Sequence, residues 1–151
     1  DKLKENFEMP DSLKYNPEKE NKPVTEEKII FEMLKVKFPD IIYHYKDKKR
    51  YPFVCDFYIP SLDLFIEYQG SMFHNKRPYL GTEEDLKEVE EIKQKSEKRK
   101  QITGKNKSRY DSLIDTWTIR DVKKRETAKK NKLNYLEFFN IEEFNEWYEK
   151  I

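Results

Sequence analysis

Apolar residues in the first third of the chain recur at helical spacing before they alternate. Residues 1–23 are polar and hold three of the seven prolines, whereas the run from Glu26 to Phe38 carries an apolar stripe at three- and four-residue spacing. Thr25 precedes this run as a candidate N-cap, and Glu26 suits the positive end of the helix dipole. We therefore expect an arm or linker over residues 1–23 and then a helix that the Phe-Pro-Asp sequence at 38–40 ends.

Downstream, the pattern predicts further strands and helices. Strands are expected at 41–45 ("IIYHY"), 53–59, 64–69 and 133–139, with a basic turn at 46–50; helices are expected from about 82 to 101, 116 to 131 and 141 to 150. The order of helix, three strands, two helices, strand and helix is typical of an α/β or α+β sandwich. A chain of 151 residues favours one core, so we expect a single domain over residues 24–151 with a charged helical insertion at 82–115.

The composition lies near the boundary with disordered proteins, because only 36% of residues are hydrophobic and 40% are charged. Ten Tyr, ten Phe and two Trp compensate, since each aromatic side chain buries a large area. The net charge of +1 hides a strong local segregation of sign, which a polyanion would sense.

The cysteine count and the hydropathy limit the class of protein. One cysteine excludes an internal disulfide and a Cys-rich zinc site, and it fits a reducing, intracellular setting. No apolar run approaches the roughly 20 residues of a membrane span. We expect a soluble, cytoplasmic protein with no membrane partner.

Two acids interrupt the second and third predicted strands. Asp56 shares a face with Tyr58, and Glu67 shares a face with Phe65 and Gln69, because alternate strand residues point the same way. A two-residue turn at 61–62 or a four-residue loop at 60–63 places Asp56 directly opposite Glu67, whereas an odd-length loop does not. Opposed like charges repel and need compensation.

A bound cation is one such compensation, and carboxylate oxygens are suited to Mg²⁺ or Mn²⁺. The pattern equally allows one acid to turn outward, or a Lys or Arg to neutralise both. These alternatives stay open at this point.

Several short motifs carry a family resemblance. The spacing from Asp56 to Glu67 and Gln69 resembles the PD-(D/E)XK nuclease signature, with Gln69 where that pattern usually has Lys. The stretches "TEEKI", "DFYIP", "YQGSMFH" and "TIRDVKKRETAKKNKLNYLEFF" resemble the branch that contains the very short patch repair endonuclease and the phage homing endonucleases with a Glu-Asp-x-His-Asp constellation. The resemblance covers roughly Val24 to Phe139.

This resemblance implies a restriction-endonuclease-like α/β fold, with a central mixed sheet of about four strands flanked by helices. It implies an Mg²⁺- or Mn²⁺-dependent endonuclease that acts on double-stranded DNA. The implied catalytic residues are Glu27, Asp56, Glu67, Gln69, His74 and Asp121, and the implied metal ligands are Asp56, Glu67 and the main-chain carbonyl of Tyr68. His74, helped by Asp121 or Glu27, would move protons, and Gln69 would orient water or phosphate.

Some of these residues also have structural explanations. An acid such as Glu27 in a first helical turn is stabilised by the helix dipole, and Asp121 could pair with Arg125 at i,i+4 spacing. His44, between two tyrosines on the first predicted strand, is interpreted as structural.

Basic clusters near the expected site are candidates for phosphate contacts, although such clusters are often only solvated faces. The candidates are Lys48, Lys49, Arg50, Lys76, Arg77, Arg120, Lys123, Lys124 and Arg125. Tyr110, Trp117 and Phe73 could contact bases, but core packing is the preferred interpretation.

The departures from the family pattern narrow the biological expectation. The repair branch has His where this chain has Gln69 and builds a zinc site that one cysteine cannot build. A DNA-associated nuclease of a phage or mobile element is therefore expected, rather than a mismatch-repair enzyme. The alternatives are a non-catalytic nucleic-acid-binding module on a nuclease-like scaffold and a protein-interaction domain. A homodimer, or a further DNA-binding domain outside a chain that begins without Met, is left open.

Overall fold

The computed structural model describes residues 25–70 and 75–151, which fall into two compact units. The sheet unit contains the described residues up to Tyr68 together with Leu133–Ile151, and the helical unit contains those from Gln69 to Lys132. The arm predicted at 1–23 and the candidate His74 lie outside the described residues.

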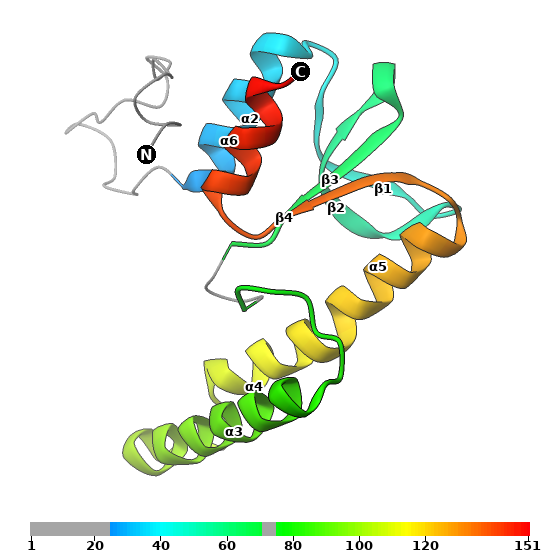
Figure 1. Cartoon of the computed structure of the whole chain (residues 1–151). Coiled ribbons are helices and arrows are strands. Elements are labelled where there is room, and N and C mark those ends of the chain that lie inside the picture. The colour runs from blue at the N-terminus through cyan, green and yellow to red at the C-terminus, as the bar shows by residue number, and fades with distance from the viewer. Residues whose placement is uncertain (1–24, 71–74) are drawn as a thin grey trace, which may run out of the picture. The chain divides into compact units, whose positions relative to one another are not determined.

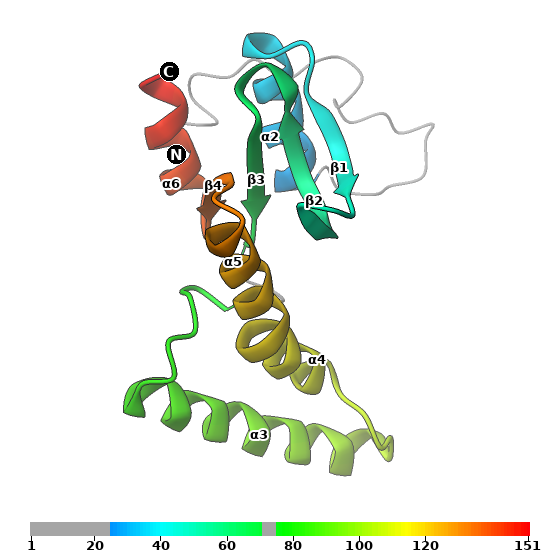
Figure 2. The ribbon, with the colours of Figure 1, turned by 90° about the vertical axis from the view of Figure 1, so that its right-hand side faces the viewer.

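A four-stranded mixed sheet forms the centre of the sheet unit (Figure 1). Its strands are β1 (Ile42–Asp47), β2 (Tyr51–Ile59), β3 (Leu64–Tyr68) and β4 (Asn134–Phe138), in that spatial order. β1, β2 and β3 pair antiparallel, whereas β3 and β4 are parallel (Figure 2). The predicted mixed sheet with flanking helices is confirmed.

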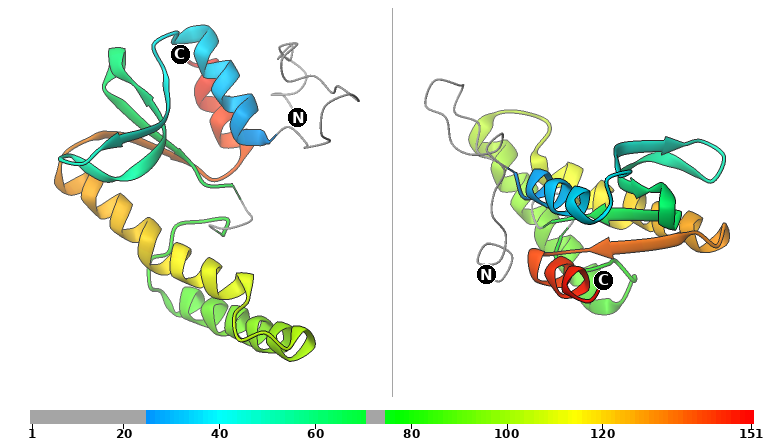
Figure 3. Two further views of the ribbon diagram at one scale, coloured as in Figure 1. Left: turned by 180° about the vertical axis from the view of Figure 1, so that it is seen from behind. Right: turned by 90° about the horizontal axis from the view of Figure 1, so that it is seen from above.

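Helices α2 (Glu26–Lys37) and α6 (Ile141–Glu149) pack against one face of this sheet and against each other (Figure 3). The Thr25 hydroxyl caps α2 by accepting from the Lys28 N–H, as predicted. The Tyr148 hydroxyl of α6 donates to the Met33 carbonyl at 2.9 Å. The core between helices and sheet includes Ile30, Leu34, Phe57, Ile66, Phe138 and Phe144.

Aromatic rings cover the other face of the sheet. Tyr45 stacks on Tyr58 with ring centroids 4.0 Å apart, and Phe65 lies within 5.5 Å of the Tyr58 and Tyr51 rings. Such pairs add to the free energy gained by burying the rings. The aromatic content therefore closes a core that the aliphatic residues alone would not fill.

The β2–β3 connection sets the register of the two acid-bearing strands. Residues Pro60–Leu62 form a 3₁₀ turn, and Asp63 follows in the left-handed region at φ 46°. Ile59 pairs with Leu64, so the four-residue loop at 60–63 is the alternative that the chain adopts. The ladder ends at Phe57–Ile66, and the same count places Asp56 opposite Glu67 just beyond it, as the predicted register has it.

The helical unit contains α3 (Glu83–Thr103), α4 (Arg109–Asp115), a π-helical turn (Thr116–Arg120) and α5 (Asp121–Lys130). Thr82 caps the start of α3, and Gly104 ends it at φ 70°, a conformation that suits glycine. The helix predicted at 116–131 begins earlier, at residue 109, because Ser108 and Asp111 form a capping box there. No helix in the described part of the chain is long and apolar enough to cross a membrane.

Arg50 joins the two turns at the ends of β2. Its guanidinium bonds to Asp47 at 2.8 Å and to Asp63 at 2.9 Å, and it lies 5.2 Å from the centre of the Phe65 ring. Its hydrogen bonds hold the pKa of both carboxyls below their ordinary value. Arg50, a predicted DNA contact, is thus engaged in holding the hairpins.

We expect Arg50→Met to destabilise the fold more at neutral than at acidic pH. Carboxyls with a lowered folded pKa contribute stability above their unfolded pKa, 3.8, and lose it as the pH falls through the folded pKa. Partly exposed pairs of this kind contribute about 0.2–1 kcal/mol each. Urea unfolding at pH 7 and pH 3 measures the difference, with Lys48→Met as the control. A loss that is equal at both pH values would assign the role of Arg50 to packing on Phe65.

Candidate metal and active site

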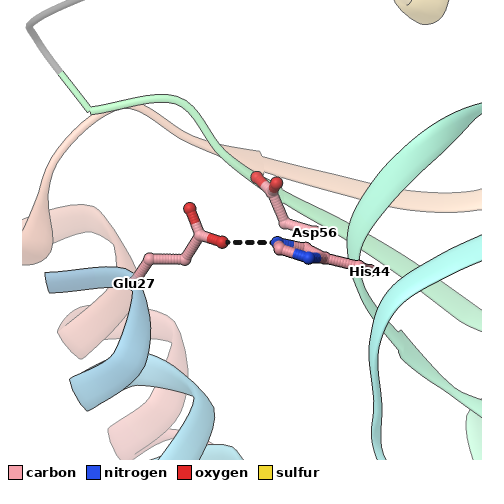
Figure 4. A group of neighbouring side chains, drawn as sticks. All are labelled: Glu27, His44 and Asp56. Atoms are coloured by element: carbon pink, nitrogen blue, oxygen red, sulfur yellow. Dashed lines mark hydrogen bonds and ion pairs between the residues drawn. The ribbon is translucent and has the colours of Figure 1, made fainter. Parts of the chain in front are cut away.

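Three ligand-type side chains from three elements of the sheet unit meet at one point (Figure 4). Glu27 comes from α2, His44 from β1 and Asp56 from β2. One ligand atom of each lies within 4.8 Å of the others, which is close enough for a single ion to contact all three. His44 is exposed, whereas Glu27 and Asp56 are half-buried, so the group is open to solvent on one side.

Glu27 reaches this point from the first turn of α2. Its Oε1 accepts a hydrogen bond from the Tyr43 hydroxyl at 2.6 Å and lies 3.1 Å from His44 Nε2. Burial, followed by the hydrogen bond to Glu27, raises the pKa of Tyr43 above its ordinary value. Tyr43 therefore stays protonated and orients the Glu27 carboxylate.

His44 joins the group because β1 departs from regular strand geometry. The pairs Tyr43–Phe57 and Tyr45–Cys55 place His44 opposite Asp56. In a regular strand His44 and Tyr43 would point to opposite faces, but His44 has φ 54°, in the left-handed region. Its ring instead stacks on Tyr43, with centroids 3.8 Å apart. The sequence interpretation of His44 as structural missed this group.

Asp56 is held by main-chain hydrogen bonds at the point where β2 and β3 stop pairing. The last ladder pair is Phe57–Ile66. Beyond it, the Asp56 N–H donates to Glu67 Oε1 and the Tyr68 N–H donates to Asp56 Oδ2, both at 2.8 Å. Each acid side chain thus takes the place of a main-chain acceptor on the opposite strand.

Glu67 is almost fully buried, with 1% of its surface exposed. Its Oε2 accepts a hydrogen bond from the Tyr51 hydroxyl at 2.7 Å. The Tyr51 hydroxyl oxygen also lies 3.3 Å from the Tyr135 hydroxyl oxygen. Burial and the charge of Glu67 raise the pKa of Tyr51, which keeps its proton for this bond. Main-chain and phenol donors therefore compensate the two opposed acids, a solution that the sequence argument did not include.

Consequently Glu67 is better suited to positioning Asp56 than to holding an ion. Among the described acids and histidines, the group gathered around Asp56 contains Glu27 and His44, not Glu67. The Tyr68 main chain lies beside the Asp56 carboxylate, but its carbonyl as a ligand stays a prediction.

The other predicted catalytic residues are not placed in this group. Gln69 and Asp121 belong to the helical unit, where both are buried, and Asp121 opens α5. His74 lies outside the described residues. Their catalytic roles stay predictions.

The residues predicted to contact phosphates differ in solvent exposure and in ion pairing. Lys48, Lys49, Lys76, Arg120 and Lys123 are exposed, and Lys124 and Arg125 are half-buried. Arg77 is ion-paired with Asp85 and Glu88, and its carbonyl accepts from the buried Trp117 indole at 2.7 Å. Trp117 thus packs within its unit, as the preferred interpretation stated.

Two carboxylates and an imidazole form a donor set that fits a divalent ion. Oxygen ligands suit Mg²⁺ and Mn²⁺ alike, but an imidazole nitrogen favours the first-row transition ions. The set therefore fits Mn²⁺ better than it fits Mg²⁺.

The chain matches no protein-family model, no curated protein and no solved structure in the comparisons.

Proposed function

We propose that the chain is a metal-dependent DNA endonuclease domain that hydrolyses phosphodiester bonds. The observation that carries this proposal is the convergence of Glu27, His44 and Asp56 within 4.8 Å in the sheet unit. An acid-rich, solvent-open group on a sheet needs a cation before a phosphate can approach it, because the carboxylates would otherwise repel the phosphate charge.

A divalent ion would be held in this group by Glu27, His44 and Asp56. When bound, such an ion supplies Lewis-acid stabilisation of the charge that develops on a phosphate. A mixed sheet whose β2–β3 hairpin carries the acids, with helices on one face, supports a restriction-endonuclease-like assignment of the fold.

Hydrogen bonds from neighbouring residues orient the carboxylates that would bind the ion, without an ion being needed for this. Tyr43 orients Glu27, and the Tyr68 N–H fixes Asp56. Glu67 in turn fixes the Asp56 main chain and is itself held by Tyr51. Ligands whose rotamers are locked in this way lose little conformational entropy when an ion binds.

DNA as the substrate is supported by the exposed lysines at the β1–β2 turn and along α5, which could contact phosphates. The ion pairs of Arg50 and Arg77 remove these two from the strongest candidates. A nuclease of a phage or mobile element remains our proposal for the biological setting.

Millimolar Mn²⁺ should raise the melting temperature, because a ligand that binds only the folded state stabilises it by mass action. Asp56→Asn should lose most of this gain. His44→Ala should weaken Mn²⁺ binding more than Mg²⁺ binding, since the imidazole is the ligand that favours Mn²⁺. Isothermal titration calorimetry and thermal melts measure both effects.

Glu146→Gln, which removes an exposed acid from α6, is the matched control and should keep the full gain. The assignment of the metal site fails if Asp56→Asn gains as much melting temperature from Mn²⁺ as the wild type and Glu146→Gln do.

Asp56→Asn should abolish cleavage of supercoiled plasmid while it leaves DNA binding in EDTA intact or tighter. Loss of a ligand that fixes the ion should cost several kcal/mol of transition-state stabilisation, or about a hundredfold in rate or more. Without metal, Asp56 only repels the DNA backbone, so its neutralisation should not weaken the complex.

Cleavage and gel-shift assays on the same preparations measure the two effects. A variant that cuts as fast as the wild type would exclude Asp56 from the chemistry. A wild type that binds duplex DNA but never cuts would instead identify a non-catalytic nucleic-acid-binding module.

A further inference from the structure

Charge is strongly segregated along α3 of the helical unit. Among the charged residues of the first half, 83–91, Lys87 is the one cation beside six acids, whereas from Ile92 to Tyr110 the one acid is Glu97. We call the exposed cations of this second stretch the basic segment; they are Lys93, Lys95, Lys98, Arg99, Lys105, Lys107 and Arg109. The segment runs from the second half of α3 through residues 104–108 into the start of α4 (Figure 2).

The helix dipole does not account for this segment. A dipole favours cations only in the last turn of a helix, and there Lys100 already serves. Lys100 is engaged with Asp111 at 3.1 Å and with Glu97 at 3.5 Å. The remaining cations extend back to Lys93, beyond the reach of the dipole.

Several of these cations act electrostatically on one phenol, that of Tyr110. Arg109 donates to the Tyr110 hydroxyl at 3.5 Å and lies 5.2 Å from the centre of its ring. The hydrogen bond from Arg109 lowers the pKa of Tyr110, and the charges of Lys95 and Arg99 lower it further. Three cations therefore lie close enough to act on the same hydroxyl.

The cations are held together by the packing of α3 on α4. The buried Ser96 bonds to the Ser108 hydroxyl at 2.7 Å and to Asp111 at 2.6 Å, which joins the second half of α3 to the start of α4. Lys95 and Arg99 are four residues apart on one helix, a like-charge spacing that destabilises a helix. An anionic partner would relieve this repulsion.

We propose that the basic segment is a binding surface for the phosphates of duplex DNA. This inference rests on the proposed function for its choice of polyanion, and it joins two basic clusters of the sequence, at 95–100 and 104–109, into one contact surface of the helical unit. Lys95 and Arg99 share one face of the helix, and between them the helix rises about 6 Å, or about two strand positions of DNA at about 3.4 Å each. Exposed lysines and arginines at this spacing fit a regular polyanion.

The test compares two double variants that remove the same charge. Lys95→Gln/Arg99→Gln changes the basic segment, and Lys35→Gln/Lys150→Gln removes two exposed cations of the sheet unit. Binding of a short duplex is measured in EDTA by fluorescence anisotropy over a series of salt concentrations. The α3 variant should bind more weakly, and the slope of log affinity against log salt should shrink by up to about 1.8, or about 0.9 per phosphate contact.

The control variant should keep most of the wild-type slope. The melting temperature of the α3 variant should be unchanged or higher, because a like-charge pair has been removed. Equal slopes for the two variants, or a wild type that does not bind duplex DNA in EDTA at low salt, would overturn the inference. Because EDTA removes cleavage from the assay, a failure here leaves the proposed nuclease chemistry to be judged by the plasmid assay.

Discussion

The reciprocal hydrogen bonding of Asp56 and Glu67 is the constraint on which the site depends. Each carboxylate accepts an N–H from the opposite strand, so side chains replace the main-chain ladder where β2 and β3 stop pairing. The Glu67 side chain can be buried because its carboxyl accepts hydrogen bonds from the Tyr51 hydroxyl and from the Asp56 N–H. The same bonds fix Asp56 on a half-exposed part of β2, where Glu27 and His44 reach it.

Much of this arrangement could be predicted because it follows from local rules. Helix capping at Thr25, strand alternation and an even-length loop at 60–63 depend on neighbouring residues, and they place Glu27 in the first helical turn and Asp56 opposite Glu67. His44 could not be found in this way. Its left-handed backbone breaks the alternation on which the strand argument depends, and no neighbouring glycine or turn signals the break.

Polar contacts between residues far apart in the chain could not be predicted from the sequence either. The Tyr51 hydroxyl that supports Glu67 is sixteen residues away, and no local pattern marks Tyr51 as its partner. Arg50 and Arg77 look like their basic neighbours in sequence, but the fold pairs each with two acids. A guanidinium held by two carboxylates must give up those bonds before it can hold a phosphate, so the exposed lysines are the better phosphate contacts.

Charge in the two units is arranged differently from charge in an ordinary stabilising network. In the sheet unit, two carboxylates and an imidazole converge, with one ligand atom of each within 4.8 Å of the others. In the helical unit, Lys95, Arg99 and Arg109 act on one phenol while Lys100, a few residues away, pairs with Asp111. Both arrangements bring like charges together on a rigid framework, which opposes folding by itself. Ligands of opposite charge would reverse the sign of that electrostatic contribution: a divalent cation in the first case and phosphates in the second. A nuclease needs both ligands, because the cation must be in place before the negatively charged backbone can approach the acids.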